Sequence, residues 1–156
     1  LSRANLSGAD LFGANLSVAK LSGASGLTAY LSTPLMMLLD QPGKIRAYKL
    51  VTAEGFGPFN GGITYAVGGS FEVTNANCDP SEECGAGINL ATLDWCLKEW
   101  KEGYRVLIAE FEASDIAMVP IGSDGKFRVH RCLIVSEKNL SEIGWPPKTS
   151  ERVLGG

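Results

Sequence analysis

Cys78 and Cys84 stand at the two ends of the acidic turn DPSEE, just before the segment GAGINLAT. A helix expected to begin near Asn89 would leave its first N–H groups unpaired, and these could activate a Cys84 thiolate or hold an anion. A structural interpretation explains the same residues: Asn89 or Thr92 caps the helix and the glycines form the turn. A disulfide between Cys78 and Cys84 fits only an oxidising compartment. We favour the structural interpretation.

The four cysteines do not have the spacing of a common zinc site. Cys78, Cys84, Cys96 and Cys132 include no C-x-x-C pair, and Cys96 falls on an expected helix while Cys132 falls on an expected strand. His130, the one histidine, is expected on the same strand face as Cys132, which suits a shared site and core packing equally. Every Ser-His-Asp or Cys-His arrangement would need His130, so no catalytic residue is assigned. We expect no bound metal and no cofactor.

Two sets of charged residues could carry chemistry, but each has an ordinary structural explanation. Glu110, Glu112 and Asp115 could work as paired carboxylates, but charges that alternate along a half-buried strand usually face water. Lys126 and Arg128 follow the turn SDG and could bind phosphate, but an Asp-Gly pair is typical of a hairpin. The glycine patterns of Walker and Rossmann nucleotide sites are absent from the sequence.

A candidate ligand site combines the aromatic, glycine-rich loop 54–62 with the expected start of the helix. Phe56 and Phe59 would supply apolar contact, and the opposite wall would offer hydrogen-bond donors to an oxygen-rich group. The alternative, which we favour, is that both phenylalanines fold inward as a small satellite core. The candidate binding residues are Tyr48, Lys49, Phe56, Phe59, Tyr65, Cys84, Asn89 and Thr92.

Composition limits the classes of function. A chain of 156 residues, 45% apolar, can bury one sizeable core, and a net charge of -3 shows no bias toward nucleic acid or anionic membranes. No apolar run approaches the roughly 18 residues of a membrane span. We therefore expect no membrane association and a cytoplasmic location. Because the chain begins inside a repeat, we also expect further repeats upstream.

The repeat has a period of five residues, LSRAN-LSGAD-LFGAN-LSVAK-LSGAS, with Leu at the first and Ala at the fourth position. This period fits neither a helix nor a simple strand. Residues 1–25 resemble the pentapeptide-repeat family, which implies about one coil of a right-handed quadrilateral β-helix. Some members of that family mimic DNA through an acidic surface. Here Asp10 stands against Arg3 and Lys20, so we expect no such mimicry.

The remaining chain predicts a fold that is mainly β or α+β. We expect a repeat coil over 1–27, a capping helix and linker over 28–44, an α+β domain over 45–143 and a loose tail over 144–156. Ser32 or Thr33 would cap the short helix, whose Leu and Met side chains would seal the coil. Within the domain we expect strands at 45–51, 104–112 and 127–137, two short strands turning at Gly68–Gly69, and one main amphipathic helix over 89–103.

Residues 47–140 resemble a small domain of uncharacterised function found in tailed-phage and related viral proteins. The resemblance lies in AYKLV, ITYAVGGSFE, CGAGINLAT, YRVLIAEFE, DIAMVP and GKFRVHRCLIV, in this order. In that domain a Cys-x-x-Gly segment precedes Phe-His, whereas here Ile88-Asn89 follow Gly87. A role carried by that histidine is therefore missing, and the resemblance implies no established activity.

Two functions remain open. The first is a non-catalytic binding or assembly module of phage or viral type that contacts a protein partner, in the host cytoplasm if phage-encoded. The second is a nucleotide-binding or ADP-ribosyltransferase-like enzyme domain, whose small nucleotide ligand would enter a cleft between loop 54–62 and the helix start at Asn89. The layout of short strands around a cleft is the basis of the second hypothesis, and fold analogy alone is weak support.

Overall fold

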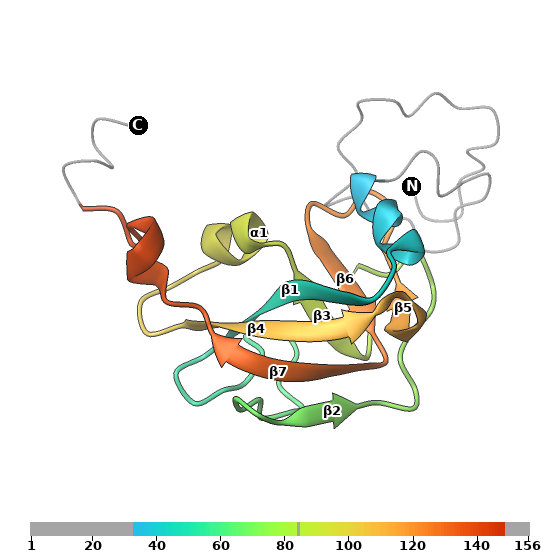
Figure 1. Cartoon of the computed structure of the whole chain (residues 1–156), viewed down its shortest axis with the longest axis horizontal. Coiled ribbons are helices and arrows are strands. Elements are labelled where there is room, and N and C mark those ends of the chain that lie inside the picture. Colours follow the sequence, from blue (N-terminus) through green and yellow to red (C-terminus); the bar gives the residue numbers. More distant parts are fainter. Residues whose placement is uncertain (1–32, 84, 149–156) are drawn as a thin grey trace.

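A computed structural model describes residues 33–83 and 85–148. Its strands are β1 (Lys44–Val51), β2 (Ser70–Glu72), β3 (Ile88–Ala91), β4 (Arg105–Glu112), β5 (Ile116–Met118), β6 (Lys126–Val129) and β7 (Arg131–Glu137). The helices are α1 (Leu93–Lys98) and three 3₁₀ helices, η2 (Pro34–Asp40), η3 (Ala113–Asp115) and η4 (Leu140–Ile143). In the described chain the strands form one seven-stranded antiparallel sheet, ordered β2-β7-β4-β1-β3-β6-β5 (Figure 1). The predicted class, mainly β or α+β, is confirmed at this level; the predicted coil lies outside the described residues.

The centre of the sheet is the pair β1 and β4. Their register runs from Lys44 opposite Glu112 to Val51 opposite Arg105 without a break. Both segments are rich in apolar and β-branched residues, which fit a pleated, buried surface. The strands predicted at 45–51 and 104–112 are therefore confirmed.

Two hydrophobic clusters lie on the two faces of the sheet. Ala47 and Val51 of β1 belong to the larger cluster, whereas Leu50 belongs to the smaller cluster beneath α1. Successive strand residues point to opposite faces, so one strand supplies both clusters. Each fully buried aliphatic side chain contributes about 1.5–3 kcal/mol of transfer free energy. No helix in the described part of the chain is long and apolar enough to cross a membrane.

The predicted helix over 89–103 is wrong in its first part. Residues Ile88–Ala91 are β3, paired with β6 through Ile88 opposite Val129 and Asn89 opposite Arg128. Helix α1 is six residues long and starts at Leu93, with Thr92 as N-cap. The 3-4 spacing of leucines suggested a helix, but pairing with a neighbouring strand overrides such local preference. Asn89 therefore does not start a helix.

The predicted hairpin at Gly68–Gly69 is also wrong. The N–H of Gly68 donates to the carbonyl of Ile134, and the N–H of Ile134 donates to the carbonyl of Gly69. β2 then pairs with β7 rather than with residues 63–67. Gly68 has φ +85, a conformation that favours glycine, so the chain does turn here as the Gly-Gly pair predicts. The strand that follows the turn pairs with β7 instead of with the residues before the turn.

His130 interrupts the strand predicted over 127–137. Its N–H donates to the carbonyl of Asp115 and its carbonyl accepts from Val73. β6 ends before it and β7 begins after it, so His130 and Cys132 do not share one strand face as predicted. The chain crosses here from the β3 side of the sheet to the β4 side.

The short helix predicted after the repeat forms as η2. Thr33 is its N-cap, and its hydroxyl oxygen accepts from the N–H of Leu35. Leu35, Met36 and Leu38 pack against the larger cluster of the sheet. The coil that they were predicted to seal lies outside the described residues.

Trp145, near the start of the loose tail predicted over 144–156, is packed. Gly144 closes η4 in a left-handed conformation, and the N–H of Trp145 donates to the carbonyl of Leu140. The ring of Trp145 meets that of Trp100 edge to face at 6.0 Å. The first residues of the expected loose tail are therefore packed.

Candidate functional site

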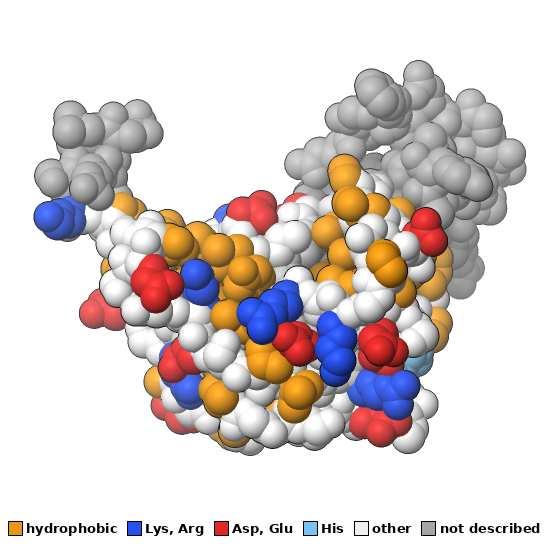
Figure 2. Space-filling view, viewed as in Figure 1, with side chains coloured by type: hydrophobic (Ala, Val, Ile, Leu, Met, Phe, Trp, Pro, Cys, Tyr) orange, Lys and Arg blue, Asp and Glu red, His pale blue; other side chains and the backbone are white. Residues whose placement is uncertain are grey.

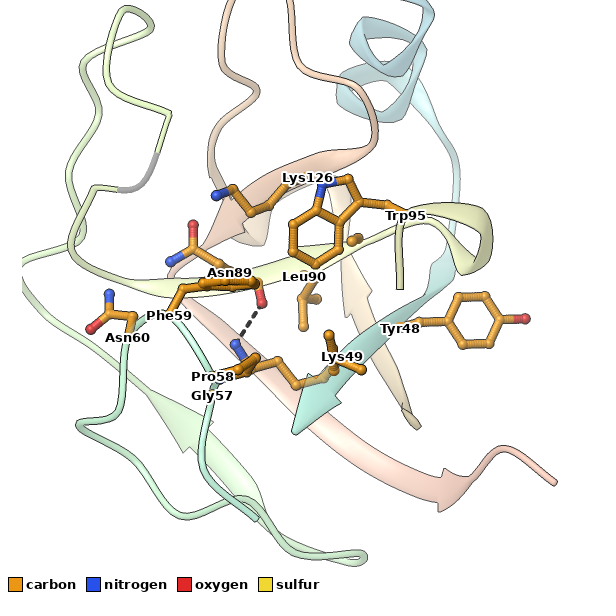
Figure 3. A pocket seen from close by; sticks show the side chains of 12 residues that line it. Tyr48, Lys49, Gly57, Pro58, Phe59, Asn60, Asn89, Leu90, Trp95 and Lys126 are labelled. Carbon is orange, nitrogen blue, oxygen red and sulfur yellow. Dashed lines mark hydrogen bonds between the residues drawn. The ribbon is translucent and has the colours of Figure 1, made fainter. Parts of the chain in front are cut away.

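A small pocket lies between loop residues 57–60, the ends of β1 and β3, and α1 (Figure 3). It encloses a cavity of about 30 Å³, room for roughly two water molecules. Lining residues come from five segments, namely β1, the loop, β3, α1 and the start of β6: Tyr48, Lys49, Leu50, Gly57, Pro58, Phe59, Asn60, Asn89, Leu90, Ala91, Trp95 and Lys126. None of them is acidic, and two are lysines.

Lys49 is the buried cation of this pocket, with 6% of the residue exposed. β1 and β3 share one register pair, Tyr48 opposite Ala91, and the strands separate beyond it. Across this gap the Lys49 Nζ donates to the backbone carbonyl of Asn89 over 2.8 Å (Figure 3). The same amine lies 4.9 Å from the ring centroid of Tyr65. In the described chain no carboxylate forms an ion pair with Lys49.

Burial lowers the pKa of Lys49 from its usual value near 10.5 to about 8. Desolvation is the largest cause, because the ammonium form loses more hydration than the neutral amine. Lys126 acts in the same direction, whereas Cys132 and Cys96 oppose it. About one tenth of Lys49 is therefore neutral at pH 7, far more than for an ordinary lysine.

Two aromatic rings and a second lysine form part of the wall. Trp95 is 8% exposed, and the Nζ of Lys126 lies 5.6 Å from the centroid of its ring. Phe59 meets Trp95 edge to face at 6.1 Å yet is 60% exposed, so it covers the pocket from the solvent side. Gly57 permits close approach to Lys49: a Cβ there would stand 3.4 Å from the Nζ.

Asn89 adds an unused acceptor. Its Nδ2 donates to the carbonyls of Gly85 and Gly87, but its buried Oδ1 has no hydrogen-bond partner in the part of the chain described. A buried amide oxygen without a partner costs free energy, so it requires a donor such as water or a ligand N–H.

The structure brings four of the predicted residues to this pocket: Tyr48, Lys49, Phe59 and Asn89. Tyr65 lies behind it, beneath the Lys49 amine and against Phe71. Thr92 occupies the N-cap position of α1 but makes no side-chain capping bond, and its buried hydroxyl oxygen has no partner among the described residues. Cys84 lies outside the described residues.

The two phenylalanines do not form the satellite core that we favoured. Phe56 is 41% exposed and forms an isolated bridge with Thr64, and Phe59 is still more exposed. The hydrogen bonds Thr52–Phe56 and Gly55–Tyr65 tie the loop base to the end of β1, which holds both rings outward.

Sequence reasoning missed Trp95 and Lys126 as members of this site. Trp95 lies in the helix predicted over 89–103 without a predicted role, and the sequence predicts Lys126 only as a possible phosphate-binding residue. The β3–β6 register places Ala91 opposite Lys126, which brings the lysine to the pocket. A pairing between strands so far apart in the sequence leaves no local signal.

Arg128, the other residue considered for phosphate binding, has a structural role. Arg128 is completely buried, and its guanidinium donates to the carbonyls of Asn77, Asp79 and Glu82. It thereby fixes the acidic turn rather than offering its charge to a phosphate. Of the carboxylates considered for catalysis, Glu110 pairs with Arg46 and Asp115 pairs with Arg131.

Cys78, Cys96 and Cys132 are free thiols. Cys78 is exposed, whereas burial raises the pKa of Cys96 to about 12 and that of Cys132 to about 11. Within residues 33–83 and 85–148, no group of three His, Cys, Asp or Glu side chains is placed to hold a metal ion.

Comparison with known proteins gives one match. Residues 1–25 match the family model of pentapeptide repeats, with 8 copies. No curated protein and no solved structure matches the chain. The repeat resemblance is therefore confirmed for residues 1–25, and the viral resemblance of residues 47–140 finds no support in these comparisons.

Proposed function

We propose that this chain, whose first 25 residues carry pentapeptide repeats, is a non-catalytic binding module that recognises a carboxylate of a protein partner at Lys49. One observation carries the proposal. The Lys49 amine is buried at a small pocket whose lining contains a second lysine and no acidic residue.

A carboxylate suits this pocket in charge and in size. An ammonium group with one backbone acceptor retains unused donors, and hydrogen bonds between ions are roughly twice as strong as those between neutral groups. Burying a cation without an anion is costly, and a bound anion would offset part of that cost. The cavity of about 30 Å³ accommodates a carboxylate but is far below the roughly 300–1,000 Å³ of a typical small-molecule pocket.

The exposed aromatics around the pocket favour a protein as the bearer of this carboxylate. Phe59 covers the cavity, and Phe56 stands exposed in the same loop. Aromatic side chains are enriched in the cores of protein interfaces, where they supply most of the contact energy. An Asp or Glu side chain, or a chain terminus, would enter beside Phe59 while flanking residues pack on both rings.

Selection of short displayed peptides tests this proposal. Peptides that bind the wild-type chain are resynthesised with each Asp changed to Asn, each Glu to Gln and the terminus amidated. We expect one such change to abolish binding, and Lys49→Met to weaken the parent peptide at least tenfold. Lys101→Met is the matched control, because this lysine is exposed and does not line the pocket. Peptides that bind Lys49→Met as well as wild type would refute the proposal.

A second function, nucleotide binding or an ADP-ribosyltransferase-like activity, remains a prediction from the sequence. Its expected cleft, between loop 54–62 and Asn89, falls where this pocket lies. A nucleotide would need the loop to open, because the cavity is too small for it as it stands. A thermal-shift screen with nucleotides and dinucleotides tests it, since a ligand at 100 times its Kd stabilises by about 2.7 kcal/mol.

The wider setting of this module is also a proposal. Residues 1–25 would form a β-helical coil, as the repeats imply, that serves as a spacer or assembly element beside the sheet domain. We place the protein in the cytoplasm, that of a host if the viral resemblance of residues 47–140 holds. Replacing Leu11 with Asp tests the coil, because a charge inside it should unfold or aggregate the protein.

A further inference from the structure

We propose that the Lys49 amine reacts reversibly with carbon dioxide to form a carbamate, and that this modification switches off the pocket. The modification is argued from the placement of the Lys49 amine beside its cavity and does not depend on the proposed function. Its regulatory effect rests on the carboxylate-binding function proposed above.

The amine is placed as a carbamylation site requires. Its Nζ is held by the carbonyl of Asn89 at 2.8 Å, with no ion pair from the described carboxylates that would keep it protonated. The adjoining cavity, about 30 Å³, has room for roughly the three heavy atoms of carbon dioxide. Pro58, Phe59 and Trp95 line it and limit access of bulk water.

The reaction balances without an oxidant or a metal. The lone pair of the neutral amine attacks the carbon of carbon dioxide, a C–N bond forms, and one C=O π pair moves to oxygen. The nitrogen then releases one proton to solvent, which leaves R–NH–COO⁻. The lowered pKa of Lys49, about 8, supplies the neutral amine near physiological pH, whereas an ordinary lysine is almost entirely protonated there.

The surroundings also suit the product. The carbamate nitrogen keeps one hydrogen, so its bond to the Asn89 carbonyl can persist. The titratable groups that act on Lys49 are Lys126, Cys96 and Cys132, with the Tyr65 ring beneath the amine. The pKa values of Cys96, Cys132 and Tyr65 are all raised, so these groups stay neutral and Lys126 is the remaining charge. A carbamate anion would be attracted to Lys126 and would repel an incoming carboxylate.

The modification is tested with ¹³C-labelled bicarbonate in a sealed NMR tube at about pH 8. Wild type and Lys101→Met should show one carbamate resonance that is missing from Lys49→Arg and disappears when the carbon dioxide is purged. Lys49→Arg keeps a cation but cannot form the carbamate. Trapping the carbamate by O-alkylation, followed by peptide mass mapping of the wild-type chain, should place the label on Lys49. This second measurement needs no variant that folds.

The outcomes separate this inference from the proposed function. Label confined to surface lysines or to the chain terminus overturns the inference, while carboxylate binding can still be measured in the absence of bicarbonate. If the label is on Lys49, half occupancy should double the apparent Kd of a selected carboxylate peptide. An unchanged Kd would overturn the regulatory effect. Absence of Lys49-dependent peptide binding when no bicarbonate is present would instead contradict the proposed function.

Discussion

The amine of Lys49 donates a hydrogen bond to the backbone carbonyl of Asn89 in the neighbouring strand β3. β1 and β3 pair at Tyr48 and Ala91 and then separate, and the Lys49 Nζ crosses the gap over 2.8 Å. A buried carbonyl without a partner would cost roughly 1–3 kcal/mol. The lysine is therefore held by the fold itself, with its amine directed to the cavity.

The first prediction concerns the pH dependence of stability. In the folded state the pKa of Lys49 is about 8, below its unfolded value of 10.5, so the unfolded chain binds more protons between these values. The contribution of Lys49 to the free energy of unfolding therefore rises with pH, by about 2 kcal/mol from about pH 7.5 to about pH 9.5. Urea unfolding of wild type and Lys49→Met at both pH values measures it.

The comparison with Lys49→Met is essential because other groups change stability in the opposite direction. Burial raises the pKa values of Cys96 and Cys132, so their unfolded forms lose protons first as the pH rises. These residues remain in both proteins, so their contribution cancels in the difference except for their electrostatic coupling to Lys49. A wild-type advantage that stays constant or shrinks with pH would contradict a buried amine of lowered pKa.

The second prediction concerns the close approach of Gly125 to α1. A Cβ at Gly125 would stand 2.5 Å from the Thr92 hydroxyl oxygen and 2.9 Å from the Cβ of Trp95, at φ +142. Gly125→Ala should therefore lower the free energy of unfolding by more than about 2 kcal/mol. Gly103→Ala is the control, since Gly103 has φ +90 but no neighbour within 4 Å, and should cost about 1 kcal/mol. Urea unfolding measures both losses, and an equal loss of unfolding free energy in the two variants would contradict a steric conflict at Gly125.

The third prediction concerns Arg128, which ties the acidic turn to β6. Its guanidinium bonds to the carbonyls of Asn77, Asp79 and Glu82, and a lysine cannot reach all of them. Arg128→Lys should destabilise the fold by about 2–4 kcal/mol and speed amide exchange over residues 77–83. Arg105→Lys, which alters a half-exposed ion pair with Glu137, should change stability by less than about 1 kcal/mol. Unaltered amide exchange over residues 77–83 in Arg128→Lys would contradict the role of Arg128 in holding the turn.

The fourth prediction concerns thiol reactivity. Cys78 is exposed, whereas burial raises the pKa of Cys96 and of Cys132 far above neutrality. Only a thiolate reacts readily, so in a Cys84→Ser background iodoacetamide at about pH 8 should modify Cys78 first. Cys96 and Cys132 should react only as the protein unfolds. Mass spectrometry of timed samples measures this, and early labelling of Cys96 would place its thiol in contact with solvent.

The sequence predicted the local features of the fold better than its pairings. The strands around Tyr48 and Ile108 follow from their apolar, β-branched composition, and the Pro34 helix follows from its cap. The assignment failed at Asn89 and at Gly68, where contacts with β6 and β7 decided the structure. Such long-range pairing is what local propensity cannot represent.

Only those residues of the candidate site that have a local sequence signal could be predicted. Lys49 and Phe59 are predictable because a Gly-rich aromatic loop next to strands is typical of a ligand site. Trp95 and Lys126 reach the pocket only through α1 and the β3–β6 register. The exposure of apolar side chains also depends on the tertiary structure. Figure 2 shows hydrophobic side chains gathered over η2, where Met37 and Leu39 remain exposed.

The central claim is that the pocket at Lys49 holds a carboxylate. Titration of ¹⁵N-labelled protein with sodium acetate, against sodium chloride at equal ionic strength, tests it most directly. We expect acetate alone to shift the indole N–H of Trp95 and the amide of Asn89 in a saturable manner, in wild type and in Lys101→Met but not in Lys49→Met. Equal shifts with chloride, or the same acetate response in Lys49→Met, would contradict a carboxylate site at this lysine.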